Sequence, residues 1–367
     1  MLGYILWNAD PEIFSLGPLH VRYYGLMFGI GFYIGYRIML NIVKREGLPQ
    51  EWVEKLFIYT IIGTVVGARL GHCLFYQPEY YLAHPIEILK IWEGGLASHG
   101  GAIGVLTALI LFSRKVSKRS VFWVLDRIVL GVALTAALIR FGNLMNSEIY
   151  GYPTDSDYGF VYLKDTKFAH MLDDGSELAK FVDDYHVEKV KGESPDGGKS
   201  WPVMFNVTLK QGISDEKQAD AIARFIIKDA LSRYVKEDGA ESNVYVEPDV
   251  QPQLKVFRGH WQATFPAFVI PKHPTHIYES LCYLFGFVLL MFLYYRTNLA
   301  EKKGFLFGLY LIITFLSRFL IEFVKENQVG FEKGMSLNMG QWLSIPFVLA
   351  GIILMIRPFI IKTKESK

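Results

Sequence analysis

Seven long apolar stretches constrain the fold of this chain more than any other feature of its sequence. Each approaches or exceeds the length that crosses about 30 Å of hydrocarbon, roughly 17 to 25 helical residues. They lie near residues 21–43, 55–76, 99–114, 121–143, 277–296, 304–324 and 340–358. Of the 367 residues, 51% are hydrophobic, more than an ordinary soluble domain carries. The sequence therefore predicts an all-α polytopic membrane protein with about seven transmembrane helices. Because the third stretch is short and begins with HGGAIG, six spans plus a re-entrant segment is the alternative.

Basic residues at the ends of these stretches predict the orientation of the chain. In a seven-span arrangement the following fall on one side: Lys44, Arg45, Arg114, Lys115, Lys118, Arg119, Arg296, Lys302, Lys303, Arg357, Lys362, Lys364 and Lys367. The positive-inside rule makes that side cytoplasmic. We therefore expect a cytoplasmic carboxyl terminus, while the amino terminus and the loops near 77–98, 144–276 and 325–339 face outward.

A long polar segment interrupts the membrane part and divides the chain into three expected regions. Residues 1–150 hold helices 1–4, 151–272 an inserted small α/β extracytoplasmic domain, and 273–367 helices 5–7. Within the insert, PVMFNVTLK alternates apolar residues with the period of a half-buried strand. A helix with Ser214 as N-cap and Gly239 as its stop is expected next. Two short strands near 243–246 and 254–257 complete a βαββ pattern.

Several function classes and processing features are not indicated by the composition. The net charge of +2 and the lack of a basic tract interleaved with aromatics argue against nucleic-acid binding. Cys73 and Cys282 lie in apolar runs, so neither a disulfide nor a metal pair is expected. The start, MLGYILWNADPEIF, lacks the pattern of a removable signal peptide. The histidines of the insert, His170, His186 and His260, are too scattered to form a catalytic constellation.

Polar residues within the spans mark the candidate site, because an ionisable side chain there costs about 2.5 to 3.5 kcal/mol. The candidates at or near the ends of spans are Arg69, His72, His99, Asp126, Arg127, Arg140, His273, Tyr278, Glu279, Arg318 and Glu322. With the two asparagines and the glutamate of RFGNLMNSE, seven polar groups fall at outward ends: His99, Arg140, Asn143, Asn146, Glu148, His273 and Glu322. Arginines that can fork onto oxygens and a histidine at this depth suit a phospholipid headgroup better than a soluble metabolite.

Structural roles compete with this interpretation at several positions. Arg318 and Glu322 are spaced i, i+4 and could neutralise one another. Asp126 and Arg127 are expected to be interface anchors, and Arg69 could be a structural partner of Glu148 or Glu322. The glycines of GGLASHGGAIG could either present backbone N–H groups to an anion or allow close helix packing.

Four blocks of sequence together resemble a known family. HGGAIGV begins at His99, RFGNLMNSEIYG at Arg140, HPTHIYE at His273 and RFLIEFVKE at Arg318. In this order, and with LHVRYYGLMFG near the amino terminus, they resemble the bacterial phosphatidylglycerol:prolipoprotein diacylglyceryl transferases. The resemblance covers the membrane part, about two thirds of the chain. It implies a multi-pass protein of the bacterial cytoplasmic (inner) membrane that transfers a diacylglyceryl group from phosphatidylglycerol to the lipobox cysteine thiol of a preprolipoprotein.

The resemblance and the chemistry together suggest roles for individual residues. A thiol is a poor nucleophile until it is deprotonated, and His99 is the candidate base, although an arginine-polarised phosphate oxygen could accept the proton instead. Arg140 and Arg318 are the candidates for stabilising the departing phosphate. Residues expected to bind or position substrate are Tyr24, Asn143, Asn146, Glu148, Gly151, Tyr278 and Glu322. Phosphatidylglycerol and preprolipoprotein signal peptides are the expected partners, with no metal and no cofactor.

The chain departs from the family pattern in its long insert and at Ser147, where a glycine is expected. The insert could gate lateral entry, dock precursors or only pack against the helices. A transporter or channel for an anionic solute is the alternative function, but spans five and seven are almost uninterrupted apolar runs. An intramembrane protease is disfavoured because no protease motif is present.

Overall fold

The chain forms two compact units. The structure, a computed structural model, describes all residues except 1–2, 17–18, 91–94, 96, 174, 193, 198, 214, 235–241, 328–331, 333 and 361–367. Unit 1 comprises Met1–Met27, Ile139–Leu281 and Ser317–Ser344. Unit 2 comprises Phe28–Leu138, Cys282–Leu316 and Ile345–Lys367. The boundaries fall inside several long helices, so the ends of those helices belong to unit 1.

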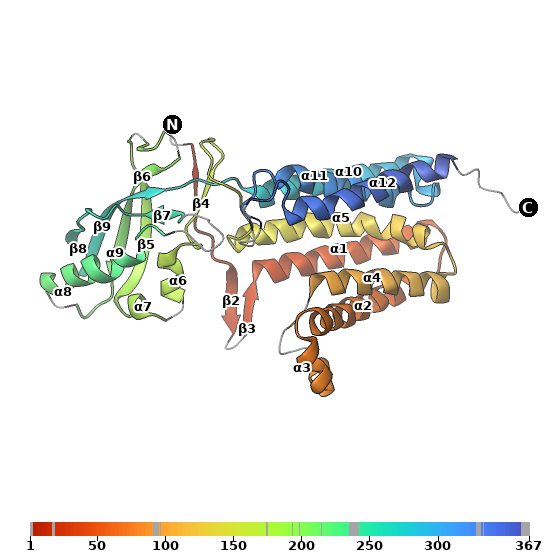
Figure 1. Cartoon of the computed structure of the whole chain (residues 1–367), viewed down its shortest axis with the longest axis horizontal. Coiled ribbons are helices and arrows are strands. Elements are labelled where there is room, and N and C mark those ends of the chain that lie inside the picture. Colours follow the sequence, from red (N-terminus) through yellow and green to blue (C-terminus); the bar gives the residue numbers. More distant parts are fainter. Residues whose placement is uncertain are drawn as a thin grey trace, which may run out of the picture. The chain divides into compact units, whose positions relative to one another are not determined.

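Long apolar helices make up most of the membrane part (Figure 1). Within the described residues, six are long and apolar enough to cross a membrane. They are α1 (Tyr23–Arg45), α2 (Glu51–Phe75), α4 (Ser98–Phe112, continued by the π-turn η3, Ser113–Ser117), α5 (Val121–Met145), α10 (Thr275–Arg296) and α12 (Met339–Ile360). Shorter helical segments connect them: α3 (Pro78–Ala83), η1 (Pro85–Leu89) and η5 (Asn298–Glu301). The prediction of a polytopic helical membrane protein is confirmed.

The sixth apolar stretch forms a shorter helix than the sequence predicts. Helix α11 (Phe305–Ile321) has 17 residues, because the chain leaves the helix to pair with the segment that follows α5. The amide of Tyr152 donates to the carbonyl of Val324 at 2.9 Å, and Gly151 bridges to Lys325. By contrast, the third stretch, which looked the weakest, continues without a break over the 20 residues Ser98–Ser117.

Buried polar contacts hold the helices of unit 2 together at the end where α5 begins. The carboxylate of Asp126, fully buried, accepts hydrogen bonds from the amides of Gly304 at 2.6 Å and Phe307 at 2.9 Å. It thereby satisfies free N–H groups at the start of α11. Arg127 pairs with Glu46 at 3.0 Å. Asp126 and Arg127 are thus buried inside the unit, where each has a structural partner.

Unit 1 contains an antiparallel sheet with helices packed on it (Figure 1). Its strands are β5 (Val182–Lys189), β6 (Trp201–Leu209), β7 (Val244–Tyr245), β8 (Gln253–Phe257) and β9 (His260–Val269), in the order β5-β6-β9-β7 with β8 also paired to β9. The helices are α6 (Lys167–Asp173), α7 (Glu177–Phe181), α8 (Glu216–Ala221), the π-helix η4 (Ile222–Ile227) and α9 (Lys228–Ala230). The predicted alternation along β6 is confirmed, since Val203, Phe205, Val207 and Leu209 all join the buried core.

The βαββ prediction for this segment was incomplete. It missed β5 and the central strand β9, in which Pro266 lies opposite Met204. A proline is rare within a sheet because it cannot donate to the ladder, so this run did not look like a central strand.

The helix predicted between these strands also differs from the structure. Asp215 caps it by accepting from the amide of Gln218 at 2.8 Å, whereas Ser214, the predicted cap, lies outside the described residues. The helix ends at Ala230 rather than at Gly239, itself outside them. It stops because the chain turns to pair beside β7, where the amide of Val246 donates to the carbonyl of Leu231 at 2.9 Å.

Two small strand pairs complete unit 1. Strand β1 (Ile5–Trp7) pairs in parallel with β4 (Phe160–Tyr162). Strands β2 (Glu12–Leu16) and β3 (Leu19–Arg22) form a hairpin directly before α1. The indole of Trp7 donates to the carbonyl of Leu144 at 3.0 Å, which fastens the amino-terminal segment to the end of α5.

Candidate functional site

The end of α5 shows why an apolar helix finishes in polar residues. The amide of Glu148 donates to the carbonyl of Asn143 at 3.2 Å, and the amide of Ser147 to that of Leu144 at 3.0 Å. This is the pair of bonds of a Schellman motif. It requires a left-handed residue at position 147, and Ser147 has a φ of 55°. A glycine adopts that conformation without steric cost, which gives a physical reason for the glycine expected there. The motif turns the chain back, so that Glu148 reaches the side chains of the last helical turns.

A chain of polar contacts runs from α10 across the end of α5. Glu279, 1% exposed, forms an ion pair with the guanidinium of Arg140. Arg140 donates to Oδ1 of Asn143 at 3.1 Å. Asn143 and Asn146 in turn donate to the same oxygen of Glu148, at 2.8 Å and 3.1 Å. Arg140, Asn143, Asn146 and Glu148, which the sequence singled out as site residues, are therefore brought together.

Several buried polar atoms in this cluster have no partner among the described residues. They include Oε1 of Glu279, Oδ1 of Asn146, the hydroxyl of Ser147 and Nε2 of His276, one helical turn before Glu279. Buried polar groups in native proteins are nearly always hydrogen-bonded. The unmet acceptors of Glu279 and Asn146 thus favour a ligand that offers hydroxyl or amide donors.

Gly151 lies where three segments of unit 1 meet. Its amide donates to the carbonyl of His273 at 2.8 Å, and it bridges to Lys325 after α11. A Cβ at this position would lie 2.8 Å from Cγ2 of Thr275 and 2.9 Å from Cβ of His273. Such distances are too short for any side chain, so Gly151 allows the end of α5, the start of α10 and the chain after α11 to join.

Two predicted tyrosines contact this region. Tyr24, at the start of α1, packs on Gly142, where an added Cβ would be 3.0 Å from its ring. Gly142 lies between Arg140 and Asn143 on α5, so Tyr24 flanks the polar chain. The hydroxyl of Tyr278 is 3.2 Å from Nδ1 of His273. Burial lowers the pKa of His273, despite the nearby carboxylate of Asp155, and so favours the neutral imidazole.

A second cluster surrounds Glu322 just beyond the end of α11. Its Oε1 lies 3.6 Å from Nε of Arg318 and 3.0 Å from Nζ of Lys325, while Oε2 accepts from Asn338 at 3.0 Å. The i, i+4 pairing of Arg318 with Glu322 is confirmed. Glu322 is 7% exposed, but the Arg318 side chain is 34% exposed. Arg318 is therefore held at one end and accessible at the other.

His99 lies in unit 2, in the first turn of α4. Its ring is exposed and meets the ring of Phe75 edge-on at 5.1 Å and that of Tyr76 at 5.9 Å between centroids. In the same unit the guanidinium of Arg69 donates to the carbonyls of Ile88 at 2.9 Å and Glu87 at 2.6 Å. Arg69 thus holds the segment after α2, and the close packing of Gly100 and Gly104 against α2 agrees with the packing interpretation of the glycines.

Sequence reasoning missed three parts of the site. Glu279 was recognised as an intramembrane carboxylate but not as the partner of Arg140, and His276 was not considered. Their spacing of i, i+3 within HPTHIYE was the available signal, because it places both on one face of α10. The third is the fully buried Lys272, which pairs with Glu326 at 2.7 Å and is not part of any apolar span.

Comparison with known proteins agrees with the motifs. A sequence model of the family described as prolipoprotein diacylglyceryl transferase matches residues 11–357. A protein of Tolumonas auensis is 38% identical over 352 residues, covering 96% of each chain. Proteins of Chloroherpeton thalassium, 34% identical over 96% of this chain and 93% of theirs, and of Porphyromonas gingivalis, 35% identical over 97% and 95%, are similar as well. All three are named phosphatidylglycerol–prolipoprotein diacylglyceryl transferase.

Proposed function

The chain belongs to the prolipoprotein diacylglyceryl transferase family, and on that premise we propose how its residues divide the work of the reaction. It is a membrane-embedded transferase of lipoprotein biosynthesis that moves a diacylglyceryl group from phosphatidylglycerol to a prolipoprotein. The comparisons give no support to the alternative of an anion transporter.

The proposed topology has seven spans, with α11 as the short sixth. The amino terminus and the inserted α/β segment 151–272 then face outward, and the carboxyl terminus is cytoplasmic. Basic residues support this orientation: Lys44 and Arg45 end α1, Arg296 ends α10 and Arg357 lies in the last turn of α12. The polar clusters at the opposite ends of α5 and α11 then lie at the outer surface of the membrane.

Arg140 and Arg318 are proposed to bind the phosphate and to stabilise its negative charge as it departs. Both are anchored by a buried carboxylate, Glu279 for Arg140 and Glu322 for Arg318. Such anchoring fixes a guanidinium before the substrate arrives, and preorganised charge is worth more than charge that must reorient during the reaction. Anchoring by Asn143 adds a second fixed point on Arg140.

The unmet acceptors next to Arg140 suit the glycerol of the donor headgroup. Phosphatidylglycerol carries two hydroxyl donors beyond its phosphate. Oε1 of Glu279 and Oδ1 of Asn146 are buried acceptors without partners among the described residues. We propose that these two atoms accept hydrogen bonds from the headgroup hydroxyls. Asn143 then holds Arg140 in place, and Glu148 holds Asn146. Tyr24 on α1 and Tyr278 on α10 then border the site.

The reaction forms a thioether at one carbon of the donor's diacylated glycerol, the carbon that is bonded to the phosphate through oxygen. The cysteine thiolate attacks that carbon, the carbon–oxygen bond to phosphate breaks, and glycerol phosphate leaves. His99, exposed at the start of α4, is proposed as the base that takes the thiol proton. A phosphate oxygen polarised by Arg140 is the alternative acceptor, since proton transfer to the leaving phosphate would also neutralise charge.

The observation that carries these roles is the fixation of Arg140 by Glu279 and Asn143. The test is transfer of acyl-labelled phosphatidylglycerol to a lipobox peptide by purified Arg140→Ala. Arg224→Ala is the matched control, because the Arg224 side chain is 45% exposed and pairs with Asp220. We expect no transfer by Arg140→Ala and normal transfer by the control, with both proteins folded. Normal turnover by Arg140→Ala would remove this residue from the site.

A further inference from the structure

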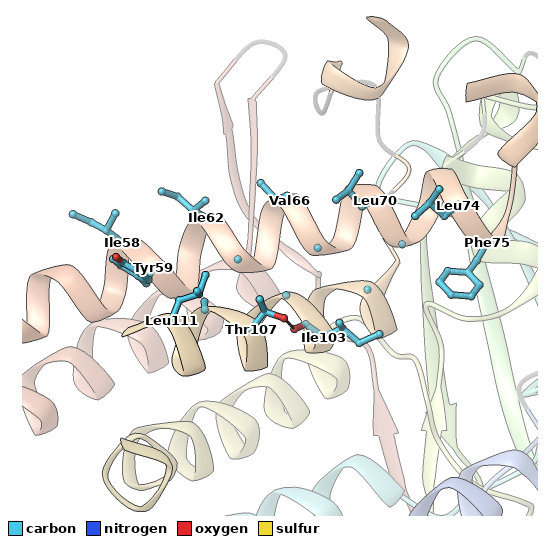
Figure 2. A pocket seen from close by; sticks show the side chains of 16 residues that line it. Ile58, Tyr59, Ile62, Val66, Leu70, Leu74, Phe75, Ile103, Thr107 and Leu111 are labelled. Carbon is cyan, nitrogen blue, oxygen red and sulfur yellow. Dashed lines mark hydrogen bonds between the residues drawn. The ribbon is translucent and has the colours of Figure 1, made fainter. Parts of the chain in front are cut away.

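Helices α2 and α4 approach so closely that a groove opens along their shared surface. A Cβ on Gly67 would lie 2.7 Å from Cα of Gly104, and one on Gly71 would lie 2.7 Å from Cα of Gly100. The backbones therefore touch where the glycines meet, and the missing side chains leave space above them. The resulting groove has a volume of about 540 Å³ (Figure 2).

The walls of the groove are predominantly apolar, with Tyr59 and Thr107 as the lining residues that carry hydroxyl groups. Figure 2 shows Ile58, Ile62, Val66, Leu70 and Leu74 in a row along one edge of α2. Their spacing of four residues places them on one face of the helix. Ile103, Thr107 and Leu111 line the groove from α4. The hydroxyl of Thr107 donates to the carbonyl of Ile103 at 2.8 Å, so it is satisfied within its own helix. An occupant of this groove is therefore held by apolar contacts.

One end of the groove reaches His99. Phe75 lines the groove, and its ring centroid is 5.1 Å from that of His99. Gly100, the next residue after His99, also belongs to the lining. A molecule lying in the groove thus ends beside the residue proposed to activate the thiol.

The dimensions of the groove match a single hydrocarbon chain. From Ile58 to Leu74 the α2 axis spans about 24 Å at 1.5 Å per residue. A volume of about 540 Å³ over that length corresponds to a mean cross-section of about 20 Å². An α-helix with side chains is about 10 to 12 Å wide and has a cross-section of roughly 80 to 110 Å². A single hydrocarbon chain, whose methylenes lie about 3.5 to 4.0 Å from the atoms packed around them, has a cross-section close to that of the groove.

We propose that this groove between α2 and α4 is the binding site for one acyl chain of the phosphatidylglycerol donor, held with its glycerol end toward His99. The assignment rests on the proposed function for the identity of the donor, but the groove and its size do not depend on it. It predicts that the chain length of the donor is sensed along the row from Ile58 to Leu74.

The first test blocks the groove from its rim. Ile62→Trp places a bulky ring into the groove, whereas Ile61→Trp, at a neighbouring exposed position outside the lining, is the matched control; Ile62 and Ile61 are 57% and 48% exposed. Each methylene displaced from an apolar site weakens binding by a factor of about four, so loss of two raises KM by about 15-fold. We expect that rise in KM for phosphatidylglycerol in Ile62→Trp, smaller with short acyl chains, and none in Ile61→Trp. Equal KM values in the two variants would overturn the proposal.

A second test does not require turnover. Phosphatidylglycerol with a diazirine in one acyl chain is crosslinked to the full-length wild-type protein in phosphatidylcholine vesicles, and the labelled peptides are mapped. Label on α2 and α4 that excess unlabelled phosphatidylglycerol removes supports the groove, even if no transfer is detected and the proposed function fails. Label that does not compete, or a KM rise in Ile62→Trp for the lipobox peptide instead of the lipid, would contradict the assignment. Ile103→Trp, with Leu106→Trp as control, repeats the test from the α4 wall.

Discussion

The ion pair between Glu279 and Arg140 makes a prediction that separates stability from catalysis. Glu279→Gln keeps the shape of the side chain but removes the charge that anchors Arg140. Both residues are largely buried, with exposed fractions of 1% for the Glu279 side chain and 16% for that of Arg140. Breaking a buried pair by removing one partner costs about 3 to 5 kcal/mol, because a charge is left without compensation. Among the described residues, Arg140 would keep its bond to Asn143 and would face a neutral amide in place of the carboxylate, so it would lose the charge that fixes its orientation.

The expected result is a less stable enzyme whose turnover falls by about 10²- to 10³-fold, the range for losing one preorganised donor to a developing negative charge. The assay combines unfolding in detergent with transfer of labelled diacylglyceryl to a lipobox peptide. The double variant Arg140→Ala/Glu279→Gln removes both charges of the pair. Its free energy of unfolding should therefore exceed, by about 1 to 3 kcal/mol, the value expected from adding the losses of the two single variants. It should remain inactive. Glu188→Gln, whose side chain is 61% exposed, is the control. Additive stability losses, or near-normal turnover in Glu279→Gln, would refute the anchoring role.

Three further predictions concern the base, the insert and the amino-terminal hairpin. His99→Asn should slow transfer and change its pH profile; an unchanged profile would assign the thiol proton to another acceptor. Replacing residues 166–268 by a short polar linker should preserve some transfer, because β1, β4 and the Phe160–Lys272 pairing remain; complete loss in a folded protein would make the sheet essential. Hydrogen bonds from His20 and Arg22 lower the pKa of Glu12. The hairpin β2–β3 should therefore lose protection from hydrogen exchange as the pH falls from about 6 to about 3, and Glu12→Gln should abolish that dependence.

Local patterns in the sequence predicted much of the fold. Apolar length indicated the long helices, and the period of two along Val203, Phe205 and Val207 identified β6. The boundaries that failed were set by contacts between distant segments. Helix α11 ends at Ile321 because Val324 pairs with Tyr152, and nothing in the run of apolar residues through this region reports that pairing.

In the candidate site, too, local spacing was predictable from the sequence, whereas contacts between distant segments were not. The spacing of Arg140 and Asn143 on one helix face was readable, as was that of Arg318 and Glu322. The pairing of Arg140 with Glu279 was not, because hydropathy fixes neither the rotation of α10 about its axis nor its neighbour. The glycine that the family pattern predicts at position 147 is explained only by the backbone conformation, since Ser147 has a φ of 55°.

The most direct test of the account follows both halves of the donor in one experiment. Phosphatidylglycerol labelled with carbon-14 in its acyl chains and tritium in its headgroup glycerol is incubated with the purified protein and a lipobox peptide. The account predicts carbon-14 on the peptide and tritium in free glycerol phosphate, in equal amounts, with neither product formed by Arg140→Ala or with a cysteine-to-serine peptide. Tritium on the peptide, or release of glycerol phosphate without peptide labelling, would contradict attack by the thiol at the carbon that bears the phosphate.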